Sequence, residues 1–334
     1  MLPQYGLSAV LTHWQFAPVV TVGSVLLAGL YGWGIVRVAR RHPARRWPLW
    51  RAFLFGTGLL VVVIATQSGL GAYDDLLFYD HMIQHILLLM VAPPLLIAGQ
   101  PLTLLLHASR NPMHTWAKRV IRSRVASFLT WPVFGAVAYA AAVMSSHLTA
   151  IASYTEQSQA WHDAEHALFV IIGYLFYLPI LGTEPIKWRL SYPIRFALLL
   201  LLMPIDTFTG VALGYASANS PGVPAGPRPG WAPDPVSDLH AGGAVMWIAG
   251  DGVMFGLMMI VFLMWARDQR AVMDGRSYFE RARQENLATM VASARSGDEP
   301  APVPADGRTI DDDEHLAAYN EYLARLNRQH ESAG

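Results

Sequence analysis

The chain has 334 residues, of which 53% are hydrophobic and only 14% are charged. A water-soluble domain usually carries about 25% charged residues, so this composition indicates a membrane protein. The 24 basic and 24 acidic residues cancel, which argues against a nucleic-acid-binding protein that works through net positive charge. The chain has no cysteine, which excludes disulfides, thiolate metal sites and iron–sulfur clusters within it.

Seven apolar stretches are long enough to cross a bilayer as helices, because about 20 apolar residues span its hydrocarbon core. They cover residues 16–38, 49–67, 79–97, 126–147, 160–181, 193–215 and 240–265. The first stretch lacks the basic segment and the cleavage site of a signal peptide, so we expect a retained helix. The sequence therefore predicts an all-α, polytopic bundle of seven transmembrane helices over residues 1–266.

Basic residues predict the orientation of this bundle, because cytoplasmic loops are enriched in Lys and Arg. They are concentrated in the first, third and fifth connections: Arg37, Arg40, Arg41, Arg45, Arg46 and Arg51, then Arg110, Lys118, Arg119, Arg122 and Arg124, then Lys187, Arg189 and Arg195. The alternate loops, 66–80, 146–162 and 215–240, contain a single basic residue, Arg228. We therefore expect a multi-pass membrane protein with its N-terminus outside and its C-terminus in the cytoplasm.

Residues 267–334 form a separate polar segment, which we expect to be a cytoplasmic tail. Its first part is typical of a helix, and the Pro- and Gly-containing stretch SGDEPAPVPADGR breaks that helix. Residues 311–329 then predict a short amphipathic helix, with acids at its N-terminal end and arginines at its C-terminal end. A loosely ordered, solvated tail is the alternative.

Histidines gather on the predicted outer side of the membrane. Those at or near this face are His13, His81, His85, His147, His162, His166 and His240. In HMIQH and in HDAEH, two histidines stand four residues apart, so both imidazoles of each pair point from one face of a helix. Both helices enter from outside, and we therefore expect the two pairs to lie at the same depth.

Two neutral imidazoles at this spacing provide half of a transition-metal site, which a second pair can complete. Imidazole combined with thioether suits copper, whereas a closed structural zinc site usually uses thiolates. The predicted metal-binding residues are His81, His85, His162 and His166, assisted by His147, His240, Met144 and Met246. Proton relay and haem ligation are other uses of such histidines.

Acidic residues surround these histidines. The outer loops carry Asp74, Asp75, Asp80, Glu156, Asp163, Glu165, Asp234 and Asp238. Such a rim would attract cations, and we expect four of its members to accept hydrogen bonds from the metal-binding imidazoles: Asp80, Asp163, Glu165 and Asp238.

Two further acids, Asp206 and Asp251, lie within predicted membrane helices. An acid at this depth costs about 2.5–3.5 kcal/mol on insertion scales, so it is normally paired, protonated or functional. Each of them is a candidate ligand or proton carrier beneath the outer site, or a hydrogen-bonding partner between helices. The sequence contains no P-loop, dinucleotide-binding glycine pattern, HExxH motif or serine elbow, and we therefore expect no enzymatic activity.

One run of residues, HMIQHILLLMVAPPLLIAGQP from His81 to Pro101, resembles the signature of the CtaG-type assembly factors of caa-type cytochrome c oxidase. Three other segments are similar to family helices: FAPVVTVGSVLLAGLYGWG, HDAEHALFVIIGYLFYLPILG and DLHAGGAVMWIAGD. The resemblance covers about residues 13–265 and excludes the tail. His240 stands where some relatives have a glutamine-like residue, so its role transfers less directly than that of His81 and His85.

The resemblance implies a seven-helix plasma-membrane protein that takes part in the maturation of a haem–copper oxidase, with oxidase subunits as partners and copper handled on the outer side. Residue spacing supports only metal binding, and the oxidase connection comes from the resemblance. Two alternatives remain: a haem-binding redox protein with His85 and His166 as axial ligands, and a copper or proton transport protein with Asp206 and Asp251 as the inner steps.

Overall fold

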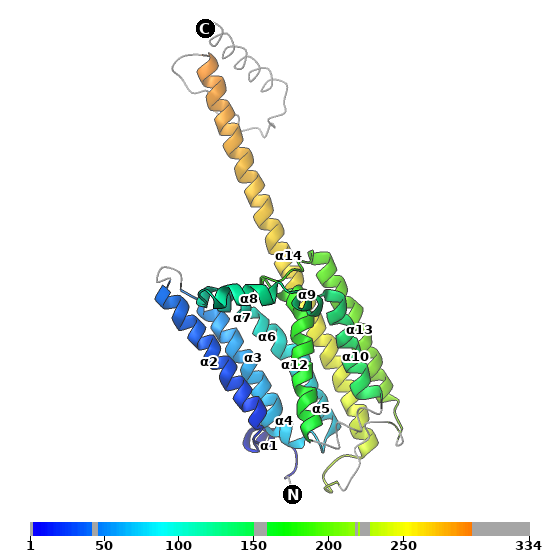
Figure 1. Ribbon diagram of the computed structural model, residues 1–334. Helices are drawn as coiled ribbons and strands as arrows, with labels where there is room; N and C mark the ends of the chain where they lie inside the picture. The colour runs from blue at the N-terminus through cyan, green and yellow to red at the C-terminus, as the bar shows by residue number, and fades with distance from the viewer. Residues whose placement is uncertain (1–2, 42–45, 150–158, 218–219, 221–227, 296–334) are drawn as a thin grey trace. The chain divides into compact units, whose positions relative to one another are not determined.

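The computed structural model describes residues 3–41, 46–149, 159–217, 220 and 228–295. Over these residues every regular element is helical and none is a strand, which confirms the predicted all-α class (Figure 1). The chain divides into two compact units, Met1–Phe262 and Leu263–Gly334. All histidines predicted to bind metal belong to the first unit, and the amphipathic helix predicted at 311–329 lies outside the described residues.

The helices differ widely in length. In chain order they are α1 (Leu7–Thr12), α2 (Pro18–Arg41), α3 (Leu49–Gln67), α4 (Gly69–Tyr73), α5 (Phe78–Ile86), the π-helix η1 (Leu87–Val91), α6 (Ala92–Ala98), α7 (Pro101–Ala108), α8 (Met113–Ile121), α9 (Arg124–Leu129), α10 (Pro132–Leu148), α12 (Gln159–Leu181), α13 (Tyr192–Gly214) and α14 (Pro235–Arg295).

Within the described part of the chain, six helical segments are long and apolar enough to cross a membrane: Pro18–Arg41, Leu49–Tyr73, Phe78–Ala108, Ala160–Leu181, Tyr192–Gly214 and Pro235–Arg270. α10 is a shorter apolar helix of 17 residues. Many large apolar side chains lie on the surface, among them Phe53, Leu201 and Ile248, which are 72%, 65% and 69% exposed. A water-soluble monomer rarely exposes so much apolar surface, so the chain is a multi-pass membrane protein.

The helix predicted over residues 126–147 is broken near its start, which corrects that prediction. α9 ends at Leu129 and α10 begins at Pro132, with Trp131 in an extended conformation (φ −68°, ψ 126°). The proline ring disfavours helical geometry in the residue that precedes it. Trp131 and Pro132 are both compatible with a membrane environment, so the apolar pattern continues across the break and hydropathy alone does not reveal it.

The segment that carries His81 and His85 changes its helix type at the proline pair. Pro93 has no N–H to donate to the carbonyl of Leu89, four residues earlier. The chain widens into η1 before α6 resumes at Ala92. Gly173 of α12 packs directly on this wider turn, and a Cβ at Gly173 would lie 2.2 Å from the carbonyl oxygen of Leu89.

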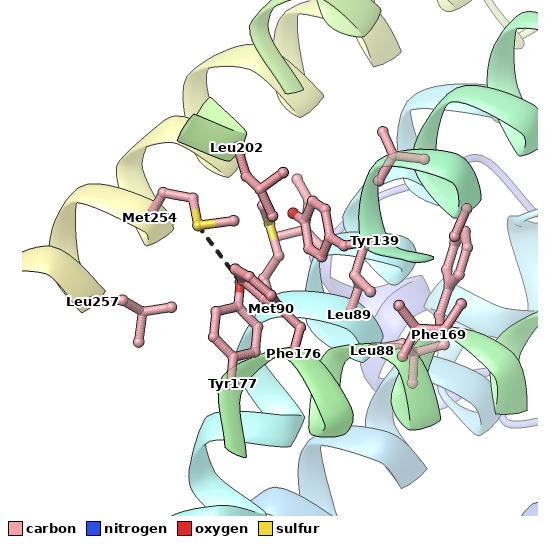
Figure 2. Close-up of a cluster of buried hydrophobic side chains, with 14 of the residues drawn as sticks. Leu88, Leu89, Met90, Tyr139, Phe169, Phe176, Tyr177, Leu202, Met254 and Leu257 are labelled. Atoms are coloured by element: carbon pink, nitrogen blue, oxygen red, sulfur yellow. Dashed lines mark hydrogen bonds between the residues drawn. The ribbon is translucent and has the colours of Figure 1, made fainter. Parts of the chain in front are cut away.

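Figure 2 shows the core, where buried side chains of α10, α12, α13 and α14 meet those of η1. Tyr139, Phe176 and Tyr177 are fully buried, and the rings of Tyr139 and Phe176 lie 5.2 Å apart. The hydroxyl of Tyr177 donates to Sδ of Met254 over 3.6 Å (Figure 2). Inside a bilayer such packing and interhelical hydrogen bonds hold helices together, since lipid is as apolar as the side chains.

Candidate metal centre

Two histidine pairs from different helices meet at one end of the bundle, near the starts of α5 and α12 (Figure 1). On α5, the ring centroids of His81 and His85 are 4.0 Å apart. On α12, those of His162 and His166 are 4.3 Å apart. The pairs approach each other most closely between His81 and His162, at 5.2 Å. The helical spacing of four residues places each pair on one face, and the two faces are turned toward each other.

A fifth imidazole, His147 of α10, determines which nitrogen of His85 carries a proton. Nδ1 of His147 lies 2.7 Å from the carbonyl oxygen of Val143, which can only accept, so this nitrogen is protonated and Nε2 is an acceptor. Nδ1 of His85 lies 3.0 Å from that acceptor and donates to it. The lone pair of His85 is therefore on Nε2, in the manner of a metal ligand held by an outer hydrogen bond.

Three ring nitrogens of the cluster have no hydrogen-bond partner among the described residues: Nε2 of His85, of His162 and of His166. These three side chains are only 4–5% exposed. A buried polar atom without a partner costs about 1–3 kcal/mol, and a bound cation would offset this cost. Neutral imidazole is the commonest metal ligand in proteins. The donor atoms of this cluster thus fit a transition-metal ion.

Carboxylates join the imidazoles in two groups of three. Within each group the potential ligand atoms lie within 4.8 Å of one another; the groups are Asp74, His162 and His166, and His81, His85 and Glu165. Burial raises the pKa of the Asp74 carboxyl well above its usual range, and the neighbouring charge of Asp75 raises it further. A cation beside Asp74 would oppose both effects.

Asp80, predicted to support an imidazole, is placed against the N-terminal segment. It is fully buried in α5 and accepts a hydrogen bond from the hydroxyl of Tyr5. Burial and the hydrogen bond to Asp80 raise the pKa of Tyr5, so the phenol remains a donor. The ring of Tyr5 also packs edge-on against Tyr73 and Tyr79. The hydrogen bond thus connects Tyr5, which precedes α1, to α5, the helix that carries His81 and His85.

Asp238, also predicted to support an imidazole, instead caps α5 from α14. Its carboxylate accepts from the backbone N–H groups of Phe78 at 3.0 Å and Tyr79 at 3.2 Å. These N–H groups belong to the first turn of a helix and have no partner within it. Arg228 donates to the same carboxylate and to the carbonyl of Leu76. Asp238 thereby sets the position of α5, one turn before His81.

A cavity of about 20 Å³ adjoins the cluster and is large enough for one water-sized body. His85 and His147 form part of its wall. Thioethers and one acid form another part: Met82, Met90, Met246 and Asp206. Met246, predicted to assist in metal binding, therefore lies beside the same cavity as His85 and His147. Thioether sulfur is a soft ligand that selects Cu(I).

The two acids inside the bundle have different surroundings. Asp206 is fully buried and accepts a hydrogen bond from the hydroxyl of Tyr139 at 3.1 Å. Asp251 accepts a hydrogen bond from Oγ1 of Thr207 at 2.7 Å, which links α14 to α13. Of these two acids, Asp206 is the one that lines the cavity. The contact of Asp251 is the interhelical hydrogen bond that was one of its two predicted roles.

Two predicted metal-binding residues, His240 and Met144, belong neither to the two ligand groups nor to the cavity wall described above. His240 of α14 donates from Nε2 to the carbonyl oxygen of Ala216 at 2.9 Å. Met144 is half-buried on α10 and is not among the residues that line the cavity. Asp163, predicted to support an imidazole, follows His162 on α12 and is half-buried. Glu156 of the acidic rim lies outside the described residues.

The sequence predicts no specific role for Tyr5 or Arg228, although both shape this site. It predicts Asp74 only as one member of an acidic rim that attracts cations. Tyr5 offered no signal, because its contact with Asp80 joins residues 75 positions apart. Arg228, the single basic residue of the outer loops, was an exception to the charge pattern, and the structure explains it by the buried carboxylate of Asp238.

The fold and the cluster define a class: a multi-pass helical membrane protein with imidazoles and carboxylates buried together at one end. The chain belongs to the family of cytochrome c oxidase caa3 assembly factors, whose family model matches residues 29–268. This match confirms the family that the sequence motifs predicted.

Uncharacterized mycobacterial proteins are similar to this chain. Those of Mycobacterium bovis and Mycobacterium tuberculosis are each 30% identical over 283 residues, which is 80% of this chain and 41% of theirs. A protein of Mycobacterium leprae is 29% identical over 278 residues, which is 78% of this chain and 40% of its own. The chain thus spans about two fifths of the length of these relatives. No solved structure gives a significant match.

Proposed function

We propose that this chain is a non-enzymatic assembly factor that binds copper through its histidine cluster and delivers the ion to a subunit of cytochrome c oxidase. The observation that carries this proposal is the presence of three buried Nε2 atoms without a hydrogen-bond partner among the described residues, on His85, His162 and His166. Imidazole nitrogen and thioether sulfur lie together here, a combination that suits copper. Family membership supplies the link to the oxidase.

The proposed topology has seven membrane spans, with α10 as the shortest. Its 17 residues extend over about 25 Å, and a bilayer can thin locally to accommodate such a helix. α8 and α9, which carry Lys118, Arg119 and Arg124, lie at the opposite end of the first unit from α4 (Figure 1). Basic residues favour the cytoplasmic side, so the histidine cluster would face the outer side of the bacterial plasma membrane and residues 267–334 the cytoplasm.

A double substitution tests the copper role. In a strain that lacks the chromosomal copy, His81→Ala/His85→Ala should accumulate in the membrane while the copper content of the purified oxidase falls severalfold. His107→Ala is the matched control, because His107 is an exposed histidine of α7 that bonds the carbonyl of Thr103. Normal copper content of the oxidase in the double variant would refute the transfer role.

Haem binding through His85 and His166 fits the geometry less well than copper. Their ring centroids are 6.1 Å apart, but His81 and Phe169 flank His85 at 4.0 Å and 4.4 Å. These rings occupy space that the porphyrin plane would need. The purified protein should therefore show no Soret band, and a band that disappears in His85→Ala would favour the haem function instead.

Copper transport is the second candidate, and the cavity next to the cluster favours it. Met90, Met246 and Asp206 line this cavity and would provide inner steps after the imidazoles. Vesicles that contain the purified protein separate the two functions, since an assembly factor that only delivers copper supports no uptake. Accumulation of copper inside such vesicles, abolished by Asp206→Asn, would support transport.

A further inference from the structure

The donor atoms of the cluster form two separate groups. Each group contains one helical pair of imidazoles and one carboxylate, and the groups are His81, His85 and Glu165, and Asp74, His162 and His166. No residue belongs to both. The first group takes its imidazoles from α5 and its carboxylate from α12. The second takes its imidazoles from α12 and its carboxylate from the connection between α4 and α5.

Each group is close to the geometry that a single ion requires. Nitrogen and oxygen ligands lie about 2.0–2.2 Å from a first-row ion, so two ligands of one ion are at most roughly 4.4 Å apart. The ligand atoms within each group lie within 4.8 Å of one another, so they need to move together by only a few tenths of an ångström to bind one ion. Two nitrogens and an oxygen are donors typical of Cu(II).

Each group contains at least one buried ring nitrogen that lacks a hydrogen-bond partner among the described residues. In the first group, Nε2 of His85 lacks a hydrogen-bond partner among the described residues, and in the second group the same is true of His162 and His166. The rings of His81 and His162 belong to different groups and lie 5.2 Å apart, so the two positions are adjacent.

We propose that the cluster holds two metal ions side by side, one on His81, His85 and Glu165 and the other on Asp74, His162 and His166. This inference rests on the proposed copper function and specifies its capacity and its carboxylate ligands. A pair of positions would let the protein carry two ions to the oxidase in one encounter.

Copper stoichiometry tests the inference on the full-length protein in detergent, freed of affinity tags and stripped with a chelator. After loading with Cu(II) and gel filtration, the wild type should retain two copper ions per chain. Asp74→Asn/His166→Gln and His81→Gln/Glu165→Gln should each retain one, and the combination of all four substitutions none. His107→Ala should retain two.

Electron paramagnetic resonance of the wild type provides a measurement that needs no variant. Two Cu(II) ions in adjacent positions couple magnetically. The signal per copper should therefore decrease when loading is raised from one copper per chain to two. One copper per chain with an uncoupled signal would overturn the two-ion inference and leave the copper function standing. Wild-type protein that retains no copper would overturn both.

Discussion

Nδ1 of His85 donates a hydrogen bond to Nε2 of His147 across the interface between α5 and α10, over 3.0 Å. Nδ1 of His147 in turn donates a hydrogen bond to the carbonyl oxygen of Val143, over 2.7 Å. Each proton position follows from the fact that a carbonyl oxygen cannot donate. The chain of bonds fixes both the tautomer and the orientation of His85, so His147 acts through His85 whether or not it touches a metal ion itself.

Replacing His147 by alanine should weaken copper binding by about 10–100-fold, the usual effect of losing an outer partner of a metal-binding histidine. The affinity is measured by competition with a chromophoric chelator on the purified protein. Ser145→Ala is the control on the same helix, because Ser145 is half-buried and its hydroxyl donates to the carbonyl of Ala142 within α10. Equal affinities of wild type and His147→Ala would contradict the role given to this hydrogen bond.

Substitutions of Asp238 and Arg228, which form an ion pair, should have non-additive effects on the free energy of unfolding. Asp238→Asn removes the charge that caps α5 and leaves Arg228, 11% exposed, without its counter-ion. Breaking one partner of a buried pair costs about 3–5 kcal/mol. Denaturant unfolding in detergent should show this loss for Asp238→Asn and for Arg228→Gln alone. The double variant should lose less than the sum, by about 0.5–3 kcal/mol. Strictly additive losses would mean that the two residues stabilise the protein separately.

The sequence was sufficient for the helical class and the family, because both depend on local patterns: apolar runs, and the spacing of His81 from His85 and of His162 from His166. It was insufficient for contacts between distant segments. The carboxylate of Asp238 could not be assigned to the N–H groups of Phe78 and Tyr79, since they are separated by 160 and 159 positions. Hydropathy also missed the break before Pro132, where the steric effect of one ring overrides an uninterrupted apolar pattern.

Glu184, in the connection after α12, caps α7 in a comparable way. Its carboxylate accepts from the backbone N–H of Leu102 at 3.1 Å and from the N–H and hydroxyl of Thr103 at 2.8 Å and 2.6 Å. Burial nevertheless raises the pKa of Glu184 above its usual value. The folded state therefore binds the proton of this residue more tightly than the unfolded state does.

A raised pKa in the folded state means that this contribution to stability is full below the unfolded pKa and is lost as the pH rises through the folded pKa. Relative to Glu184→Gln, the wild type should lose stability as the pH increases from about 4.5, by at most about 1.4 kcal/mol per pH unit. The comparison is made by unfolding both proteins in detergent across this pH range, so that the other titrating groups cancel. Parallel curves for the two proteins would show that Glu184 has the same proton affinity folded and unfolded.

Gly173→Ala should destabilise the bundle and weaken copper binding together. The added Cβ would meet the carbonyl oxygen of Leu89 at 2.2 Å and Cγ of Pro93 at 2.7 Å, both on the segment that continues α5. Neither atom belongs to a flexible side chain end, so α12 must move away, at a cost of about 1–3 kcal/mol. α12 carries His162 and His166 while α5 carries His81 and His85, so this movement separates the two imidazole pairs.

Gly56→Ala is the matched control for Gly173→Ala, because a Cβ at Gly56 of α3 meets nothing within 4 Å. In a helix, alanine is favoured over glycine by up to about 1 kcal/mol, so Gly56→Ala should melt at or slightly above the wild-type temperature. Gly173→Ala gains the same helical preference and should still melt several degrees lower. Thermal unfolding in detergent and the copper titration measure the two effects. If Gly173→Ala behaved like Gly56→Ala in both, the close approach of α12 to Leu89 would not be what holds the two histidine pairs together.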